Sequence, residues 1–220
     1  MFDEKLQSTL LSLSTAMLAD ARVRLGLPEN HLDSGIRPVV PFSKMAGCAV
    51  TVELEMAPDE ASADLSGVVQ AYEEPGVACP IIVIQIPEAA HHQGIFGEGA
   101  ATMARKTGYV GVLVEGAVRD SHELRDMEFP AFSRCSAPGY IVGHVSVKTV
   151  GEPVVIGGRT IRKGDVILAD NDGVIVVGAE DLEAVVEKSL AIKQWEIGVH
   201  SQVAAGKTAS EAIGVVGPMP

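Results

Sequence analysis

Short hydrophobic runs alternate with helix-prone segments in the middle of the chain. Ile81–Ile86 is apolar on both faces, which is typical of a buried parallel strand, and Tyr109–Glu115 is a second β-branched run that closes at Gly116. The predicted elements of residues 47–137 are strands at 48–54, 81–86, 109–115 and 129–135 and helices at 64–74, 98–107 and 120–127. This alternation predicts β/α units.

The flanking segments have different patterns. Residues 3–25 carry leucines at helical spacing, and residues 179–205 predict a long C-terminal helix followed by a loose tail after Gly206. Residues 143–178 predict an antiparallel block, with hairpin turns at Gly157-Gly158 and at 170–173. The whole chain, residues 1–220, is therefore predicted to be one α/β domain of layered, mixed sheets.

Composition narrows the classes of protein. The 220 residues carry a formal net charge of −12, and no run of lysines or arginines occurs, so nucleic acid is not expected as the main partner. The best apolar run is too short for a membrane span, and no signal peptide is predicted. Three cysteines without a C-x-x-C spacing predict reduced, buried thiols and a cytoplasmic protein.

Two polar positions near the strand at 109–115 are the best candidates for chemistry. Arg119 and Asp120 follow that strand, where α/β proteins place ligand sites. Gly97-Glu98-Gly99-Ala100 opens a predicted helix, and its backbone N–H groups can hold a carboxylate. An anion bound there would need a cation beside Glu98, either Arg119 or a metal ion. His91 and His92 are adjacent, which makes them a poor metal pair.

The segment GEGAATMARKTGYVGVLVEGAVRDSHEL resembles the signature of the RraA-like family. The resemblance covers most of residues 10–195 and includes Leu13–Ala21, Gly47–Val52 and Gly164–Gly178. It implies a layered α/β/β sandwich of the swivelling-domain type, assembled as a homotrimer or homohexamer. The family includes divalent-metal 4-hydroxy-4-methyl-2-oxoglutarate aldolases, which also decarboxylate oxaloacetate, and the regulator of ribonuclease E activity.

The resemblance also implies roles for individual residues. Asp120 corresponds to the direct ligand of Mg²⁺ or Mn²⁺, and Arg119 to the guanidinium that binds substrate and stabilises an enolate. Glu98 corresponds to an acid that orients metal-bound water, and the backbone of 97–100 to the grip on a substrate carboxylate. From the pattern alone, Asp120 is equally a helix N-cap with Glu123 as its partner. Glu196 lies where some members supply an acid to a neighbouring subunit.

The resemblance implies two possible functions of different classes. The first is a metal-dependent lyase that releases pyruvate from a small 2-oxo acid such as 4-hydroxy-4-methyl-2-oxoglutarate, with oxaloacetate decarboxylation through the same enolate. The alternative is a protein-binding regulator of ribonuclease E activity, which usually lacks the aspartate found here at 120. A Schiff-base mechanism ranks low, because Lys106 is predicted to be solvated. Many members read GELLA or GDLLA, and Gly99 removes a bulky side chain from the pocket, which leaves the substrate open.

Overall fold

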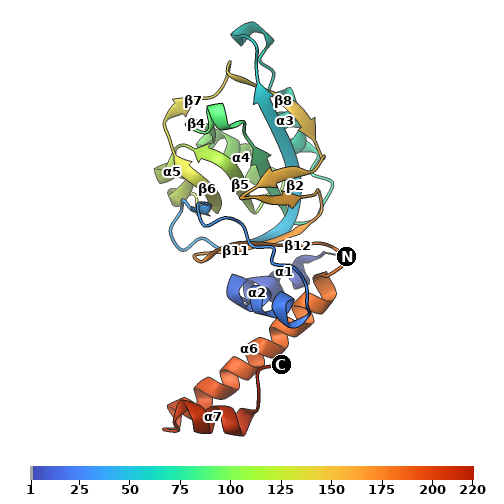
Figure 1. Ribbon diagram of the computed structural model, residues 1–220. Coiled ribbons are helices and arrows are strands. Elements are labelled where there is room, and N and C mark those ends of the chain that lie inside the picture. The colour runs from blue at the N-terminus through green and yellow to red at the C-terminus, as the bar shows by residue number, and fades with distance from the viewer. Residues whose placement is uncertain (1) are drawn as a thin grey trace.

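The computed structural model describes residues 2–220 and forms a mixed sheet with helices on both sides (Figure 1). The helices are α1 (Glu4–Leu11), α2 (Thr15–Arg24), α3 (Ser66–Glu73), α4 (Glu98–Lys106), α5 (Ser121–Asp126), α6 (Leu182–Ala204) and α7 (Ala209–Val216). The strands are β1 (Arg37–Pro38), β2 (Met45–Met56), β3 (Pro80–Gln85), β4 (Gln93–Phe96), β5 (Gly111–Val118), β6 (Ala131–Ser136), β7 (Gly139–Tyr140), β8 (Val145–Val150), β9 (Val154–Ile156), β10 (Arg159–Ile161), β11 (Val166–Asp170) and β12 (Gly173–Val177).

The main sheet has the strand order β1-β6-β5-β3-β2-β11-β12. Strands β2, β3, β5 and β6 pair in parallel, whereas β8 and β11 pair with β2 in the antiparallel sense. The β9–β10 hairpin forms a separate two-stranded sheet, and its turn uses Gly157 and Gly158 at positive φ. The mixed α/β fold expected from the sequence is therefore confirmed.

Strand β3 shows why its sequence is apolar without alternation. Ile82 and Ile84 pack into the core under α3 and α4, whereas Ile81 and Val83 pack into a second core with the β9–β10 hairpin. All four side chains are fully buried, as expected for a central parallel strand covered on both faces. A third core lies between the β11–β12 hairpin and the helices α1, α2 and α6.

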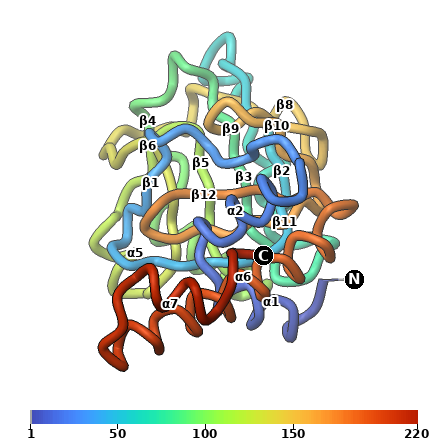
Figure 2. Tube along the Cα trace, turned by 60° about the horizontal axis from the view of Figure 1, so that its bottom comes forward, coloured from blue at the N-terminus to red at the C-terminus, as the bar shows by residue number. Residues whose placement is uncertain are grey.

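The predicted N-terminal helix over residues 3–25 is wrong in one respect, because the chain forms two helices there. Helix α1 ends at Leu11, and the Ser14 hydroxyl accepts a hydrogen bond from the Met17 amide at 3.1 Å, which caps a new helix. The break lets Leu13 turn into the core while Lys193 of α6 donates to the Ser12 carbonyl at 2.7 Å. Helices α1, α2, α6 and α7 lie on one side of the sheet in Figure 1, and that side is turned toward the viewer in Figure 2.

The prediction of a loose tail after Gly206 is also wrong. Thr208 and Glu211 form a reciprocal capping box that starts α7, and the Trp195 indole donates to the Gly217 carbonyl at 2.8 Å. Helices α6 and α7 extend away from the sheet (Figure 1). No helix among residues 2–220 is both long enough and apolar enough to cross a bilayer.

The cysteines differ in their surroundings. All three are free; Cys48 is buried, Cys79 is half-buried, and Cys135 is exposed, so the expectation of three buried thiols is wrong for Cys135. Burial and then the neighbouring Cys79 raise the pKa of the Cys48 thiol to about 11. Cys48 is therefore a neutral, unreactive core residue.

Phe96 is the last residue of β4 and is fully buried in the core. Its fully buried ring stacks on Phe129 with centroids 5.6 Å apart and meets the edge of Tyr72 at 6.4 Å. We expect Phe96→Ala to lower the free energy of unfolding by about 3–5 kcal/mol, measured by urea denaturation. The matched control is Phe42→Ala, whose ring is 87% exposed and whose loss should change stability by less than about 0.5 kcal/mol. Equal unfolding midpoints for the two variants would contradict this packing.

Candidate active site

The site forms where β4 and β5 run side by side and where each strand is followed by a helix. The sequence predicts a strand that closes at Gly116, but β5 continues through Gly116 at φ +152° to Val118, with an irregular register against β6. Strand β4 lies between the predicted strand at 81–86 and the predicted helix at 98–107, where no element was predicted. It pairs in parallel with this extension through Gly94↔Ala117 and Phe96↔Val118. Arg119 and Asp120 therefore follow the strand directly, beside the start of α4.

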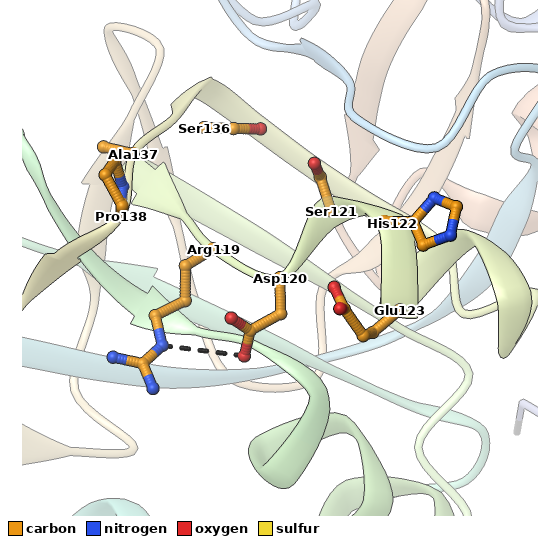
Figure 3. A pocket seen from close by; sticks show the side chains of 8 residues that line it. All are labelled: Arg119, Asp120, Ser121, His122, Glu123, Ser136, Ala137 and Pro138. Atoms are coloured by element: carbon orange, nitrogen blue, oxygen red, sulfur yellow. Dashed lines mark ion pairs between the residues drawn. The ribbon is translucent and has the colours of Figure 1, made fainter.

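The Asp120 carboxylate is held in position by backbone. Its Oδ2 accepts a hydrogen bond from the Glu98 amide at 3.1 Å and lies 3.6 Å from Nε of Arg119 (Figure 3). The Asp120 backbone is left-handed, with φ 53° and ψ 42°, a conformation that aspartate and asparagine tolerate better than other L-residues. Its side chain makes no capping bond to α5, so the capping-box alternative with Glu123 is wrong; the carboxylate instead satisfies an amide of α4.

Arg119 has a fixed backbone and a partly exposed guanidinium. The Arg119 amide donates to the Phe96 carbonyl at 2.8 Å, which fixes the residue to β4. Its guanidinium carbon lies 5.9 Å from the centre of the Tyr140 ring, within the range of a cation–π contact. The side chains of Arg119 and Asp120 remain 38% and 36% exposed, so both are open to a ligand.

Two glycines make this close packing feasible. A Cβ on Gly97 would lie 2.3 Å from Oδ2 of Asp120 and 3.0 Å from Cγ of Arg119, and one on Gly94 would lie 2.7 Å from Cβ of Arg119. Glycine is therefore required at both positions for the pair to sit against β4. Gly99 differs, because its Cβ would meet nothing within 4 Å.

Arg119 and Asp120 line two cavities at once. The larger cavity, about 570 Å³, is lined by Arg119, Asp120, Ser121, His122, Glu123, Ser136, Ala137 and Pro138 (Figure 3). The smaller cavity, about 170 Å³, is lined by Gly94, Ile95, Gly97, Gly99, Ala100, Arg119, Asp120, Tyr140, Ile141 and Val142. The residues singled out from the sequence at 97, 99, 100, 119 and 120 thus share one cavity.

Glu98 contributes its amide to the site rather than its carboxylate. Among the described residues its exposed side chain lines neither cavity, and its N–H is already used by Asp120. The amides of Gly99 and Ala100 come next at the start of α4, where helical N–H groups lack intrahelical partners. An anion at this helix start would therefore be bound by Gly99 and Ala100.

The remaining candidates lie outside the two cavities. The His91 ring lies 3.0 Å from the Ile86 carbonyl, and the His92 ring lies 3.1 Å from the Gln93 amide nitrogen. Glu196 belongs to α6. Figure 1 shows that helix on the opposite side of β11 and β12 from α4 and α5 of the same chain.

Part of the cavity wall was not predicted from the sequence. Tyr140, Ile141 and Val142 were not singled out, although they form a short apolar run between Pro138 and Gly143. That run was a signal for a buried or ligand-facing segment, but nothing local indicates that β7 pairs with β4.

The donor set is suited to a hard divalent cation that keeps most of its waters. Of the two carboxylate oxygens of Asp120, Oδ2 accepts the hydrogen bond from Glu98 and faces Arg119. Oδ1 has no hydrogen-bond partner among the described residues and is therefore available as a metal ligand. No group of three or more His, Cys, Asp or Glu side chains converges in residues 2–220, so a cage built wholly from protein ligands is absent there. One carboxylate with several waters is a coordination that Mg²⁺ accepts.

Fold and site together define a class: mixed α/β proteins whose ligand cavity lies between a strand end and the start of a helix. A family model described as Aldolase/RraA matches residues 15–176. The chain belongs to the RraA-like family, as the sequence resemblance indicated.

Individual relatives carry different descriptions. Protein DlpA of Legionella pneumophila is 28% identical over 92% of this chain, which spans only 32% of the length of DlpA. A Halalkalibacterium halodurans protein named "Putative 4-hydroxy-4-methyl-2-oxoglutarate aldolase" is 29% identical over 81% of this chain and 79% of its own. The structure of Streptomyces coelicolor RraAS2, described as an unusual member of the RNase ES inhibitor RraA protein family, is 24% identical with a TM-score of 0.75 over 89% of this chain and 95% of its own.

Proposed function

We propose that the protein is a divalent-metal-dependent lyase that cleaves a carbon–carbon bond of a 4-hydroxy-2-oxo acid and releases pyruvate. Oxaloacetate decarboxylation would proceed through the same enolate. The observation that carries the proposal is the cavity shared by Arg119, Asp120 and the helix start at Gly99 and Ala100. The relative named as an aldolase supports the reaction class.

Each part of the cavity has a chemical task in this reaction. A bound Mg²⁺ or Mn²⁺, with Asp120 as its protein ligand, would supply Lewis-acid polarisation of the keto oxygen. The Gly99 and Ala100 amides would hold the substrate carboxylate. Arg119, a planar cation on a fixed backbone, would bind the oxygen on which negative charge develops when the bond breaks.

A proton must also leave the C4 hydroxyl of the substrate. The base that we assign is water at the Asp120 carboxylate, because Asp120 lines both cavities whereas the Glu98 side chain lines neither. Protonation of the enolate carbon then yields pyruvate. For oxaloacetate, loss of CO₂ replaces the retro-aldol step, and the same Arg119 contact stabilises the enolate.

Chelation provides the direct test. We expect EDTA to abolish pyruvate release from 4-hydroxy-4-methyl-2-oxoglutarate and oxaloacetate, and Mg²⁺ or Mn²⁺ to restore it, measured with coupled lactate dehydrogenase. Calcium added at the same concentration serves as the control, because it prefers more ligands and longer bonds. Full activity after EDTA treatment would contradict the metal mechanism.

The protein-binding regulator is the other candidate, supported by the description of RraAS2. Binding of the chain to a ribonuclease E-type enzyme, with no turnover of any 2-oxo acid, would favour it. We propose a homotrimer or homohexamer as the assembly, and sedimentation velocity distinguishes the two.

A further inference from the structure

The smaller cavity has a charged end and an apolar end. Arg119 and Asp120 form the charged end, and the rest of the lining is glycine backbone or hydrophobic side chain. Val142 is half exposed and Ile141 is buried, so this wall continues from the core to the surface. A ligand that binds its polar end at Arg119 would place its other end against Tyr140, Ile141 and Val142.

Tyr140 is held at this position by the backbone around it. Strand β7 pairs with β4 through Gly94↔Tyr140, and Gly139 approaches so closely that a Cβ there would lie 2.7 Å from the His92 carbonyl oxygen. The ring is 59% exposed and lies beside the Arg119 guanidinium. One aromatic face thus borders both the charged end and the opening of the cavity.

The charge balance limits what this apolar end can accept. Among the described residues that line the smaller cavity, Arg119 is the only cation, and Asp120 is an anion beside it. Arg119 is committed to the 2-oxo acid end of the substrate, so a second carboxylate would be left unpaired against hydrophobic side chains in a protein of net charge −12. Desolvating an unpaired carboxylate is costly, whereas burying alkyl groups is favourable.

The larger cavity does not offer a better position for a second carboxylate. It has hydroxyl groups from Ser121 and Ser136, but Glu123 also lines it. The His122 ring lies 3.6 Å from the Asp126 carboxylate and is largely exposed. A second substrate carboxylate placed there would face the carboxylates of Asp120 and Glu123. The one guanidinium among the described lining residues is that of Arg119, which the proposed reaction already uses.

We infer that the preferred substrates are 4-hydroxy-2-oxo acids whose C4 substituent is uncharged and apolar, with Tyr140, Ile141 and Val142 as the wall that recognises it. This inference rests on the proposed lyase function and narrows it. The carbonyl product other than pyruvate would then be a hydrophobic aldehyde or ketone rather than an oxo acid. Retro-aldol cleavage forms that C=O from the C4 hydroxyl, while the C3–C4 electrons pass to the enolate.

A substrate series tests the inference on the parent protein with Mg²⁺. We expect kcat/KM to rise about fourfold per methylene from 4-hydroxy-2-oxopentanoate through the hexanoate to the heptanoate. We expect kcat/KM for 4-hydroxy-2-oxoglutarate to be at least about tenfold lower than kcat/KM for the heptanoate. A preference for the dicarboxylate, or no dependence on chain length, would overturn the inference.

A charge placed in the wall sharpens the test. Val142→Arg introduces a cation at a side chain that is 49% exposed and should therefore fold. We expect it to raise the ratio of kcat/KM for 4-hydroxy-2-oxoglutarate over the heptanoate by at least about tenfold. The matched control is Val155→Arg, at a valine 48% exposed on β9, away from both cavities, and it should leave the ratio unchanged. An equal change in both variants would contradict recognition by this wall.

Different results would overturn the substrate assignment and the lyase function. Pyruvate release that depends on Mg²⁺ but favours the dicarboxylate overturns only the assignment of an apolar substituent. Absence of pyruvate release from every member of the series, with and without Mg²⁺, overturns the lyase function and the substrate assignment together.

Discussion

Replacing Asp120 with asparagine is expected to lower pyruvate release by at least about 10³-fold without unfolding the protein. A Lewis-acid metal supplies several kcal/mol of transition-state stabilisation, and each 1.36 kcal/mol corresponds to a factor of ten in rate. Asparagine keeps the left-handed backbone and can still accept the hydrogen bond from the Glu98 amide. The loss would therefore report on the negative charge at Oδ1 rather than on the fold.

The controls separate charge from local structure. Asp126→Asn removes a carboxylate from the same short helix α5 at an exposed position outside both cavities, and it should keep the parent activity. Thermal unfolding should show Asp120→Asn within a few degrees of the parent protein. Mn²⁺ binding followed by electron paramagnetic resonance should weaken only in Asp120→Asn. Unchanged Mn²⁺ affinity in that variant would show that the metal lies elsewhere.

Local patterns were sufficient for much of the fold. The double-sided burial of β3 follows from an unbroken apolar run, and the β9–β10 turn follows from paired glycines. The N-terminal break was not predicted, because the leucine spacing continues through Ser12-Leu13-Ser14 and masks the capping serine. Helix α7 was missed for the opposite reason: it is too short for periodicity to stand out, although its Thr208-x-x-Glu211 cap was readable.

The site was predictable only where its residues are neighbours in sequence. Arg119 and Asp120 are adjacent, and Gly97–Ala100 forms one helix start, so each half could be recognised alone. Their meeting depends on the parallel pairing of β4 with β5, and β4 contains Gly94, which weakens any strand signal. The wall at Tyr140 depends on a further pairing, of β7 with β4. Such long-range pairings leave no local pattern in the chain.

Gly97→Ala should displace the Asp120 carboxylate without removing it, so that the effect of its position can be measured. The added methyl would lie 2.3 Å from Oδ2 of Asp120, so the carboxylate must move by more than half an ångström or the start of α4 must shift. Displacement of a catalytic group on this scale costs on the order of 10²-fold in rate. We therefore expect kcat/KM to fall about 10²-fold, although every charged side chain of the site is retained.

Substitutions at two other glycines serve as controls for Gly97→Ala. Gly214 is in α7, away from the site, and its Cβ would meet nothing within 4 Å, so Gly214→Ala should keep the parent kcat/KM. Gly99→Ala adds a methyl in open space within the same segment as Gly97. We expect kcat/KM of this variant to fall by less than tenfold. A loss from Gly99→Ala equal to that from Gly97→Ala would indicate a general disturbance of α4.

The combination of the two site variants decides whether Gly97 acts through Asp120. If the methyl at 97 lowers activity by displacing that carboxylate, then Gly97→Ala in the Asp120→Asn background has little left to remove. The double variant should then lose far less than the product of the two single losses, because residues in direct contact are not additive. Fully multiplicative losses would mean that Gly97 supports the reaction by a separate route, such as the approach of the substrate to the Gly99 and Ala100 amides.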